Sequence, residues 1–193
     1  MRFEIIFHTP FRVASGHAGD GSDTTVDRGA LLPASSLKGL MRSAARDLLK
    51  LPEPLVDQVF GTGWQPSPWS WSDAAVTAGR GAEPAIRPRA RIRIDAESGT
   101  AASGALLIAD EVLAARAEFT VDQAGWIAPA DAPAHEAVLL ASARAVTSAG
   151  GDRRRGLGWV TITPAEPPWS QPHLDAVIRL MERGGAAGGG DDG

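Results

Sequence analysis

Three aspartates lie close together near the start of the chain, in a loop rich in glycine and hydroxyl residues. They are Asp20, Asp23 and Asp27 in the segment GDGSDTTVD. Such a loop can bring carboxylates near one another without burying them, and hard cations such as Mg²⁺ prefer oxygen ligands. The loop therefore suits a metal ion or a reacting group. The alternative is that these aspartates only terminate or solvate a loop.

A helix is predicted directly after this loop. Pro33 stops any earlier element, and Ser35 or Ser36 suits the N-cap because its side-chain oxygen can accept a hydrogen bond from a free helix N–H. Apolar residues then recur at the spacing of one buried helix face. They are Leu37, Leu40, Met41, Ala44, Ala45 and Leu48.

Another face of this helix is basic, with Lys38, Arg42 and Arg46 at every fourth position. A helix N-terminus has free N–H groups and a partial positive charge, so a phosphate could bind beside Ser35, Ser36 and Lys38. An ordinary solvated surface is the alternative.

Two further arginine clusters follow. The net charge of −4 argues mildly against a nucleic-acid binder, but the arginines are concentrated in these clusters. In RPRARIRID a strand would display Arg87, Arg89, Arg91 and Arg93 on one face. In GGDRRRGLGWV, glycines bracket a run of three arginines. Glycine lets a backbone approach a phosphate closely, and the planar guanidinium group suits phosphate. The second cluster comprises Gly150, Gly151, Arg153, Arg154, Arg155, Gly156 and Gly158.

The remaining pattern alternates strands and helices. Strands are predicted at 2–7, 87–95, 100–107, 118–121 and 159–162, and helices at 55–60, 133–147 and 173–183. Ile6 breaks the alternation of the first strand and suggests a strand covered on both faces. The region 64–81 has no clear period, and its residues Trp64, Trp69 and Trp71 are expected to pack on the core or on a neighbouring subunit rather than stack on bases.

Three stretches together resemble one protein family. LLPASSLKGLMRSAA is similar to the proline, small residue, Ser-Ser-Leu-Lys-Gly signature of the RAMP superfamily, the RNA-binding subunits of CRISPR effector complexes. GGDRRRGLGWV resembles the glycine-rich loop of that superfamily, and the run 94–119 resembles its segment that carries an arm along guide RNA. The similarity is greatest to the backbone subunits of type III complexes.

The element order and the resemblance imply an α+β fold, a ferredoxin-like or RRM-like sandwich with a β-hairpin thumb and inserted loops. We expect one RNA-binding domain over residues 1–183, with an insert at about 62–86 and the thumb at about 87–132. Residues 184–193 form a glycine-rich tail that is expected to be disordered.

The resemblance also implies a function: binding of guide RNA and metal-dependent cleavage of the paired target RNA. Asp23 best matches the family's catalytic, metal-holding aspartate, with Asp27 as the near alternative and Mg²⁺ or Mn²⁺ as the cation. A non-catalytic backbone protomer is the main alternative, followed by a guide-RNA processing endonuclease. Expected RNA ligands are His17, Ser35, Ser36, Lys38, Arg42, Arg46, Arg89, Arg91, Arg153, Arg154, Arg155, Gly156 and Gly158.

The expected partners are guide RNA, target RNA, other RAMP-type subunits and copies of the chain itself. No membrane partner is expected, because no apolar run is long enough to cross a bilayer. The first residues, MRFEIIFHTPF, lack the regions of a signal peptide, and the sequence has no cysteine. These features favour a cytoplasmic protein without disulfide bonds or thiolate metal sites.

Overall fold

A computed structural model describes residues 1–16, 18 and 22–188 of the 193-residue chain. Its main sheet is antiparallel and has the strand order β2-β6-β1-β7, with β3 also paired to β6. The strands are β1 (Arg2–Phe7), β2 (Trp69–Trp71), β3 (Ala75–Thr77), β6 (Arg116–Gln123) and β7 (Val160–Glu166). The two central strands, β1 and β6, therefore come from opposite halves of the chain.

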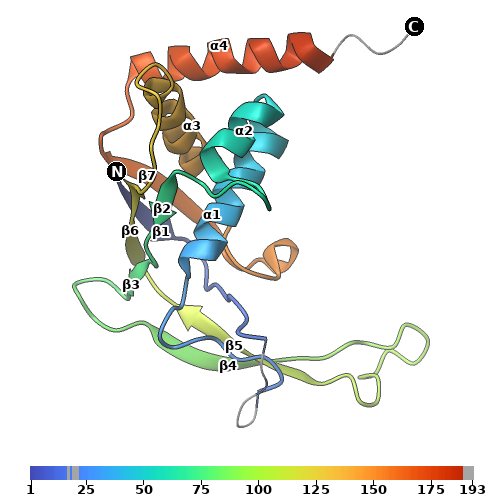
Figure 1. Cartoon of the computed structure of the whole chain (residues 1–193). Helices are drawn as coiled ribbons and strands as arrows, with labels where there is room; N and C mark the ends of the chain where they lie inside the picture. The colour runs from blue at the N-terminus through green and yellow to red at the C-terminus, as the bar shows by residue number, and fades with distance from the viewer. Residues whose placement is uncertain (17, 19–21, 189–193) are drawn as a thin grey trace, which may run out of the picture.

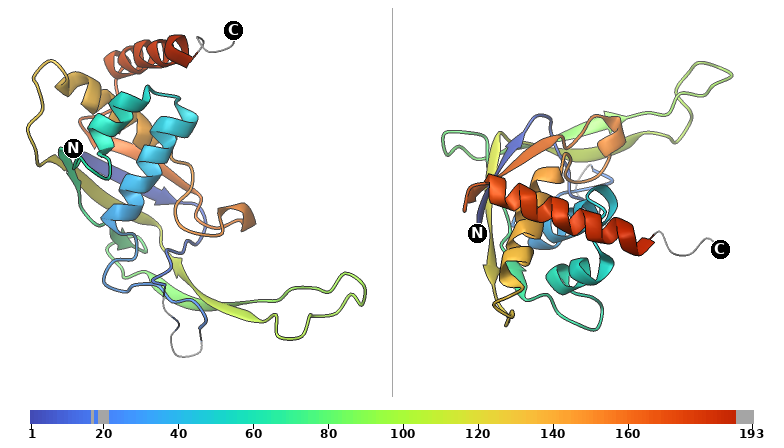
Figure 2. Two further views of the ribbon diagram at one scale, coloured as in Figure 1. Left: turned by 45° about the vertical axis from the view of Figure 1, so that its right-hand side comes forward. Right: turned by 90° about the horizontal axis from the view of Figure 1, so that it is seen from above.

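Helices cover one face of this sheet (Figure 1 and Figure 2). They are α1 (Ala34–Ser43), which continues as a π-helical turn over Ala44–Leu48, α2 (Glu53–Phe60), α3 (Ala132–Ala145) and α4 (Gln171–Gly188). The path β1-α1-β2-β6-α3-β7, together with its strand order, is the ferredoxin-like arrangement. The predicted α+β ferredoxin-like fold is confirmed.

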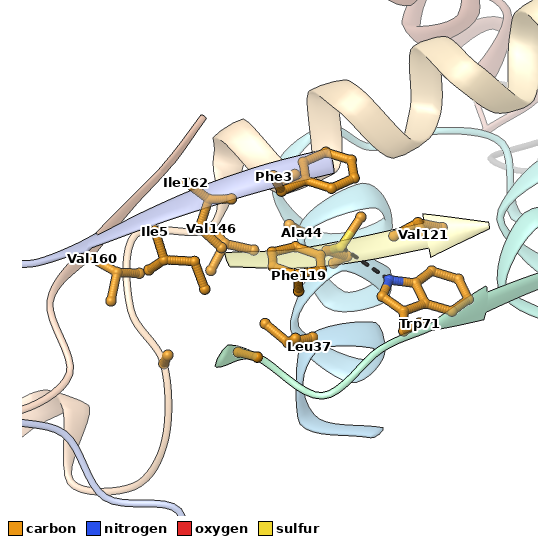
Figure 3. Packing of buried hydrophobic residues seen from close by; sticks show 14 of the residues in the cluster. Phe3, Ile5, Leu37, Ala44, Trp71, Phe119, Val121, Val146, Val160 and Ile162 are labelled. Atoms are coloured by element: carbon orange, nitrogen blue, oxygen red, sulfur yellow. Dashed lines mark hydrogen bonds between the residues drawn. The ribbon is translucent and has the colours of Figure 1, made fainter. Parts of the chain in front are cut away.

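The core forms between the helices and the inner face of the sheet (Figure 3). Phe3, Ile5 and Phe7 of β1 alternate inward, and the rings of Phe3 and Phe119 stack with their centroids 4.9 Å apart. Ile6 points to the opposite, uncovered face and is 40% exposed. The expectation that both faces of β1 are covered was therefore wrong.

The first helix begins two or three residues earlier than predicted, and neither Ser35 nor Ser36 caps it. Pro33 occupies the N-cap, and the carboxylate of Asp73 accepts a hydrogen bond of 2.8 Å from the backbone N–H of Ala34. A carboxylate therefore already lies at the site predicted for phosphate beside the helix start. This carboxylate comes from the β2–β3 connection, which lies close to the start of α1 only in the folded chain.

The buried face of this helix is largely as predicted. Leu37 and Met41 are fully buried, whereas Leu48 is 62% exposed. The last turn is π-helical and has more residues per turn than an α-helix, so the α-helical spacing no longer assigns Leu48 to the core.

Strands β4 (Ala85–Arg91) and β5 (Leu107–Leu113) form a separate hairpin that projects from the domain (Figure 1). The predicted thumb of 87–132 was too long, because β6 belongs to the main sheet. The predicted insert of 62–86 likewise supplies β2 and β3 to that sheet. Both errors have the same cause. The pairing of β6 with β1, and of β2 and β3 with β6, joins distant segments and cannot be read from local periodicity.

The insert tryptophans differ in their surroundings. Trp71 is buried with its indole nitrogen 3.3 Å from the sulfur of Met41, and Trp69 donates a hydrogen bond of 3.2 Å to Nδ1 of His135. Burial lowers the pKa of His135 and favours the neutral ring that accepts this bond. Packing is thus confirmed for two tryptophans, whereas Trp64 is 98% exposed.

The C-terminal helix is longer than the sequence indicates. Its backbone is helical through Gly188, so the predicted disordered tail cannot begin at residue 184. Residues 189–193 lie outside the described part of the chain. Among the residues that the structure describes, no helix is long and apolar enough to cross a membrane.

Candidate functional site

The segment 150–158, which we call the Gly-Arg loop, is held against the chain that follows β1. The backbone N–H of Gly151 donates to the carbonyl of Arg12 at 2.8 Å, and that of Gly158 donates to the carbonyl of Pro10 at 2.8 Å. Between these anchors, Arg153–Arg155 form an exposed 3₁₀ turn. The loop therefore presents three guanidinium groups from a backbone that is tied down at both ends.

Two of the predicted glycine ligands have different roles in this loop. Both Gly156 (φ 82°) and Gly158 (φ 71°) adopt positive φ angles. A Cβ on Gly158 would overlap the carbonyl oxygen of Ala149, whereas a Cβ on Gly156 would meet open space. Gly158 is buried and serves close backbone packing, so the structure does not present it as a phosphate contact.

These two glycines allow a matched prediction. Gly156→Ala should cost about 1–3 kcal/mol of unfolding free energy, the usual strain of a non-glycine residue at positive φ. Gly158→Ala carries the same strain plus the overlap with Ala149, so we expect a clearly larger loss. Urea unfolding of both variants measures the difference, and equal losses would show that the Ala149 contact does not constrain the loop.

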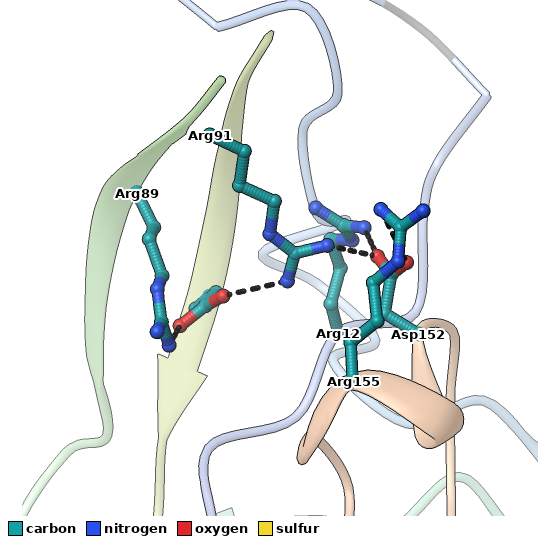
Figure 4. Close-up of polar contacts among 6 residues, drawn as sticks. Arg12, Arg89, Arg91, Asp152 and Arg155 are labelled. Carbon is teal, nitrogen blue, oxygen red and sulfur yellow. Dashed lines mark hydrogen bonds and ion pairs between the residues drawn. The ribbon is translucent and has the colours of Figure 1, made fainter. Parts of the chain in front are cut away.

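A cluster of ion pairs joins the Gly-Arg loop to the hairpin (Figure 4). Asp152 contacts Arg12, Arg91 at 2.8 Å and Arg155 at 3.9 Å. Glu111 of β5 contacts Arg89 and Arg91, each at 3.2 Å. We call this set the arginine cluster: Arg12, Arg89, Arg91, Glu111, Asp152 and Arg155.

The arginine cluster carries excess positive charge. It sets four guanidinium groups against two carboxylates, and burial together with the nearby Arg91 lowers the pKa of Arg12. One terminal nitrogen of Arg12, Nη1, is buried without a hydrogen-bond partner. An anion would be attracted to this cluster, because its own carboxylates balance only half of the positive charge.

The hairpin arginines line a hollow together with the loop. Arg89, Arg91, Arg93 and Arg155 surround a cavity of about 530 Å³. Only part of the predicted row of arginines lies on one strand here, because Arg93 lies beyond the end of β4 and Arg87 is not among the residues that line the hollow. Arg91, however, has a side chain only 17% exposed and is held by two carboxylates, so its main role is to join the hairpin to the loop.

The helix α1 meets the loop with its small residues and not with its basic ones. Ser36, Gly39 and Ser43 line a hollow of about 350 Å³ together with Gly151 and Arg153. Helix α1 and the Gly-Arg loop therefore share one groove. The groove wall from α1, which also includes Leu40, carries no charged side chain.

The three basic residues of the predicted helix face have local partners instead. The ammonium group of Lys38 lies 5.4 Å from the ring centroid of Trp71, and burial lowers the pKa of Lys38. Arg42 pairs with Asp57 of α2 at 2.8 Å. Lys38 and Arg42, both expected RNA ligands, thus contact β2 and α2 and do not line the groove.

Arg46, the third basic residue of this predicted face, pairs with its neighbour in sequence. Its Nε lies 2.8 Å from the carboxylate of Asp47. The hydrogen bond from Arg46, followed by that from Ser43, lowers the pKa of Asp47 to about 2. The charge of Arg46 is thereby balanced locally rather than directed into the groove.

Asp23 lies beside the hairpin. Its backbone N–H donates to the carbonyl of Ile108, and its Oδ2 accepts from the N–H of Ile108, both at 2.8 Å. Asp27 instead accepts a hydrogen bond from the N–H of Gly29, also at 2.8 Å, in a local turn. Both residues are exposed, but only Asp23 is attached to the hairpin that carries the arginines. The candidates Asp20 and His17 lie outside the described residues.

In the described part of the chain, few side chains that could hold a cation lie near Asp23. Within the described ranges, no group of three or more acidic, histidine or cysteine residues could hold a metal. A single carboxylate still fits Mg²⁺, which binds through one or two carboxylates and keeps water and substrate phosphate as its other ligands. Asp23 fits that mode, since it is exposed and positioned by two backbone hydrogen bonds.

Three residues important to this site were missed in the sequence: Arg12, Glu111 and Asp152. Asp152 had a signal, because it directly precedes the three arginines. Arg12 gave no signal in the sequence, because it lies in an ordinary apolar stretch. It comes close to Asp152 only when β1 and β7 pair in the sheet. Glu111 lies opposite Arg87 in the hairpin. This pairing could be predicted only with the correct bounds of β5, and the predicted strand ended at residue 107.

The fold and this site define a ferredoxin-like α+β protein with an arginine-bearing glycine loop beside a projecting hairpin. The family model of the RAMP superfamily matches residues 4–161, which is most of the chain, so the chain belongs to the RAMP superfamily. No curated protein matches it.

Two solved structures have a similar fold. One is a chain of the type III-B Cmr-beta complex in its apo state, determined by cryo-EM, with a TM-score of 0.64, 15% identity, and coverage of 83% of this chain and 95% of that one. The other is a chain of type III-B Cmr-beta bound to cognate target RNA, with a TM-score of 0.66, 15% identity, and coverage of 91% and 97%.

Proposed function

We propose that this chain is a guide-RNA-binding backbone subunit of a type III CRISPR ribonucleoprotein and cleaves the target RNA paired to the guide. The observation that carries the proposal is the convergence of α1, the Gly-Arg loop and the hairpin on a site with excess arginine charge. Membership of the RAMP superfamily supports it, as does the similar fold of a chain in an RNA-bound type III-B complex. The proposed partners are guide RNA, target RNA, other RAMP-type subunits and copies of this chain.

Recognition of the guide rests on its backbone. The exposed groups of the loop are guanidinium groups, which form bidentate bonds with phosphate, and the α1 wall offers the hydroxyl group of Ser36. Neither kind of contact distinguishes one base from another. A subunit of this kind leaves sequence recognition to pairing between guide and target.

For cleavage, Asp23 would hold Mg²⁺ or Mn²⁺. Bound there, the cation would supply charge stabilisation at the scissile phosphate. The 2′-hydroxyl of the RNA would attack the phosphorus in line and lose its proton to solvent, and the 5′-oxygen of the next nucleotide would leave and take up a proton from solvent. The N–H of Ile108 orients the Asp23 carboxylate, and the hairpin arginines bind the neighbouring phosphates. The chain's own contribution is thus to position the Asp23 carboxylate beside the bound RNA strand.

Charge reversal in the loop tests the RNA grip. Arg154→Glu should weaken guide binding several-fold and reduce the slope of log affinity against log salt by about 1, because it removes one phosphate contact. Arg179→Glu is the matched control, since Arg179 is also exposed but lies on α4. Binding isotherms between 50 and 200 mM salt give both values, and equal slopes for the two variants would reject the contact.

The assembled wild-type complex distinguishes an enzyme from a scaffold. Complementary target RNA should be cut at regular positions in Mg²⁺ or Mn²⁺ and remain intact in EDTA. RNA that binds but stays intact in both metals would favour a non-catalytic backbone protomer. This second candidate is retained because the described part of the chain has no cluster of three or more metal-ligating residues.

A further inference from the structure

The outer face of the main sheet is uncovered, and one end of it is acidic. Arg2 lies 3.3 Å from Glu4, 3.7 Å from Glu118 and 3.2 Å from Glu166. Three carboxylates surround this one cation, so the local charge opposes the approach of an RNA phosphate. An RNA strand on this face is therefore restricted to the other end.

The other end of the face, next to the Gly-Arg loop, presents His8 and Trp159. Their neighbours Phe7 and Val160 are buried in the core, so both side chains point to the outer face, and Trp159 is 57% exposed. Tryptophan is enriched at binding interfaces, because its ring is apolar and its indole N–H can donate a hydrogen bond.

Hydrogen bonds hold this pair in position. The N–H of His8 donates to the carbonyl of Trp159 at 2.8 Å, and the N–H of Trp159 donates to Oγ1 of Thr9 at 3.0 Å. Nε2 of His8 lies 2.8 Å from Oγ1 of Thr161. The indole is therefore presented from an ordered backbone, and binding to it loses little conformational freedom.

A hollow of about 360 Å³ lies beside His8. Its walls are mainly apolar, with Phe7 and Leu113 among them, and Thr9 and Glu83 add polar groups. A small volume with apolar walls and a few polar groups is the usual form of a ligand pocket. The carboxylate of Glu83 can accept hydrogen bonds from the amino or imino groups of a base.

We propose that His8, Trp159 and this hollow form a binding site for one unpaired RNA base. The inference rests on the proposed RNA-binding function, because the strand would arrive from the Gly-Arg loop. Arg155 and Trp159 are four residues apart, so their Cα atoms lie within roughly 14 Å of each other. One RNA strand can thus place a phosphate on the loop and a base on the indole, whose aromatic face accepts any base.

Paired RNA ligands test this site in the purified full-length chain. The probes are a single-stranded oligoribonucleotide and an oligomer of the same length that has the sugar-phosphate backbone but no bases. Trp159→Ala should weaken binding of the normal RNA by about 5- to 100-fold and leave the abasic oligomer unaffected. Trp159→Phe should retain most of the affinity, and Trp64→Ala, which removes a 98% exposed indole, should change neither ligand. Crosslinking with 4-thiouridine RNA should modify Trp159 or His8.

The possible failures are distinguishable. If Trp159→Ala binds both ligands like the wild type while Arg154→Glu still weakens binding, the base site is wrong and the RNA-binding function stands. If the wild-type chain binds neither ligand, the proposed function fails and the base site with it. If Trp159→Ala keeps its RNA affinity but no longer joins the complex, the patch is a protein contact, which also overturns the inference.

Discussion

Replacing Asp152 with asparagine should lower the free energy of unfolding by about 3–5 kcal/mol, the usual loss when one partner of a buried ion pair is removed. Asp152 is the carboxylate that Arg12 and Arg91 share, and the side chains of these arginines are only 9% and 17% exposed. Without it, Arg12 keeps a buried charge and loses the carboxylate that contacts it. The effect should be visible in urea unfolding and in faster proteolysis of the hairpin.

Asparagine is the informative substitution at this position. Asp152 has a φ of 55°, and asparagine tolerates this left-handed conformation nearly as well as aspartate. The substitution therefore removes the charge without adding backbone strain. Asp57→Asn is the matched control, because it breaks the more exposed pair with Arg42 and should cost under about 1 kcal/mol. Similar losses for the two variants would mean that the arginine cluster contributes no more than a surface ion pair.

Replacing Asp23 with asparagine should reduce target-RNA cleavage by the assembled complex at least about 100-fold and leave RNA binding unchanged. Asparagine keeps a side-chain oxygen that can accept the hydrogen bond from Ile108, so the loop should stay attached to β5. It loses the negative charge that holds a divalent cation, whose charge stabilisation is worth several kcal/mol. Single-turnover cleavage rates with saturating complex measure the change.

Asp27→Asn provides the comparison within the same loop. The side chain of Asp27 bonds to the N–H of Gly29, and an asparagine oxygen can do the same. We expect cleavage by this variant to stay within a few-fold of the wild type. A large loss for Asp27→Asn alone would move the catalytic assignment to that residue, and normal cleavage by both variants would exclude the two of them.

The sequence was most informative where the structure depends on neighbours along the chain. Strand β1 was predicted with the bounds that the structure shows, and the buried face of α1 followed from its spacing. The Gly-Arg loop was recognised because its glycines and arginines are consecutive. Each of these features is determined by periodicity or composition within a short window.

The features that were missed depend on contacts between distant segments. Arg12 and Asp152 are 140 positions apart, and the cap of α1 comes from Asp73, 39 residues after the N–H it accepts. Lys38 was assigned to the RNA site from its charge, its place near the helix N-terminus and the family resemblance. Its contact with Trp71 becomes evident only once β2 lies beside the helix. Pairing of this kind leaves no periodic signal in one sequence.

The pairing of β1 has a consequence for synthesis of the chain. The first strand hydrogen-bonds to β6 and β7, with Ile5 opposite both Ala117 and Ile162. A nascent chain therefore cannot complete its central sheet until β7 has left the ribosome, and such long-range closure is slow. Because the Gly-Arg loop is anchored to the residues that follow β1, the groove forms at the same late stage. Incomplete chains thus lack the arrangement that would capture RNA.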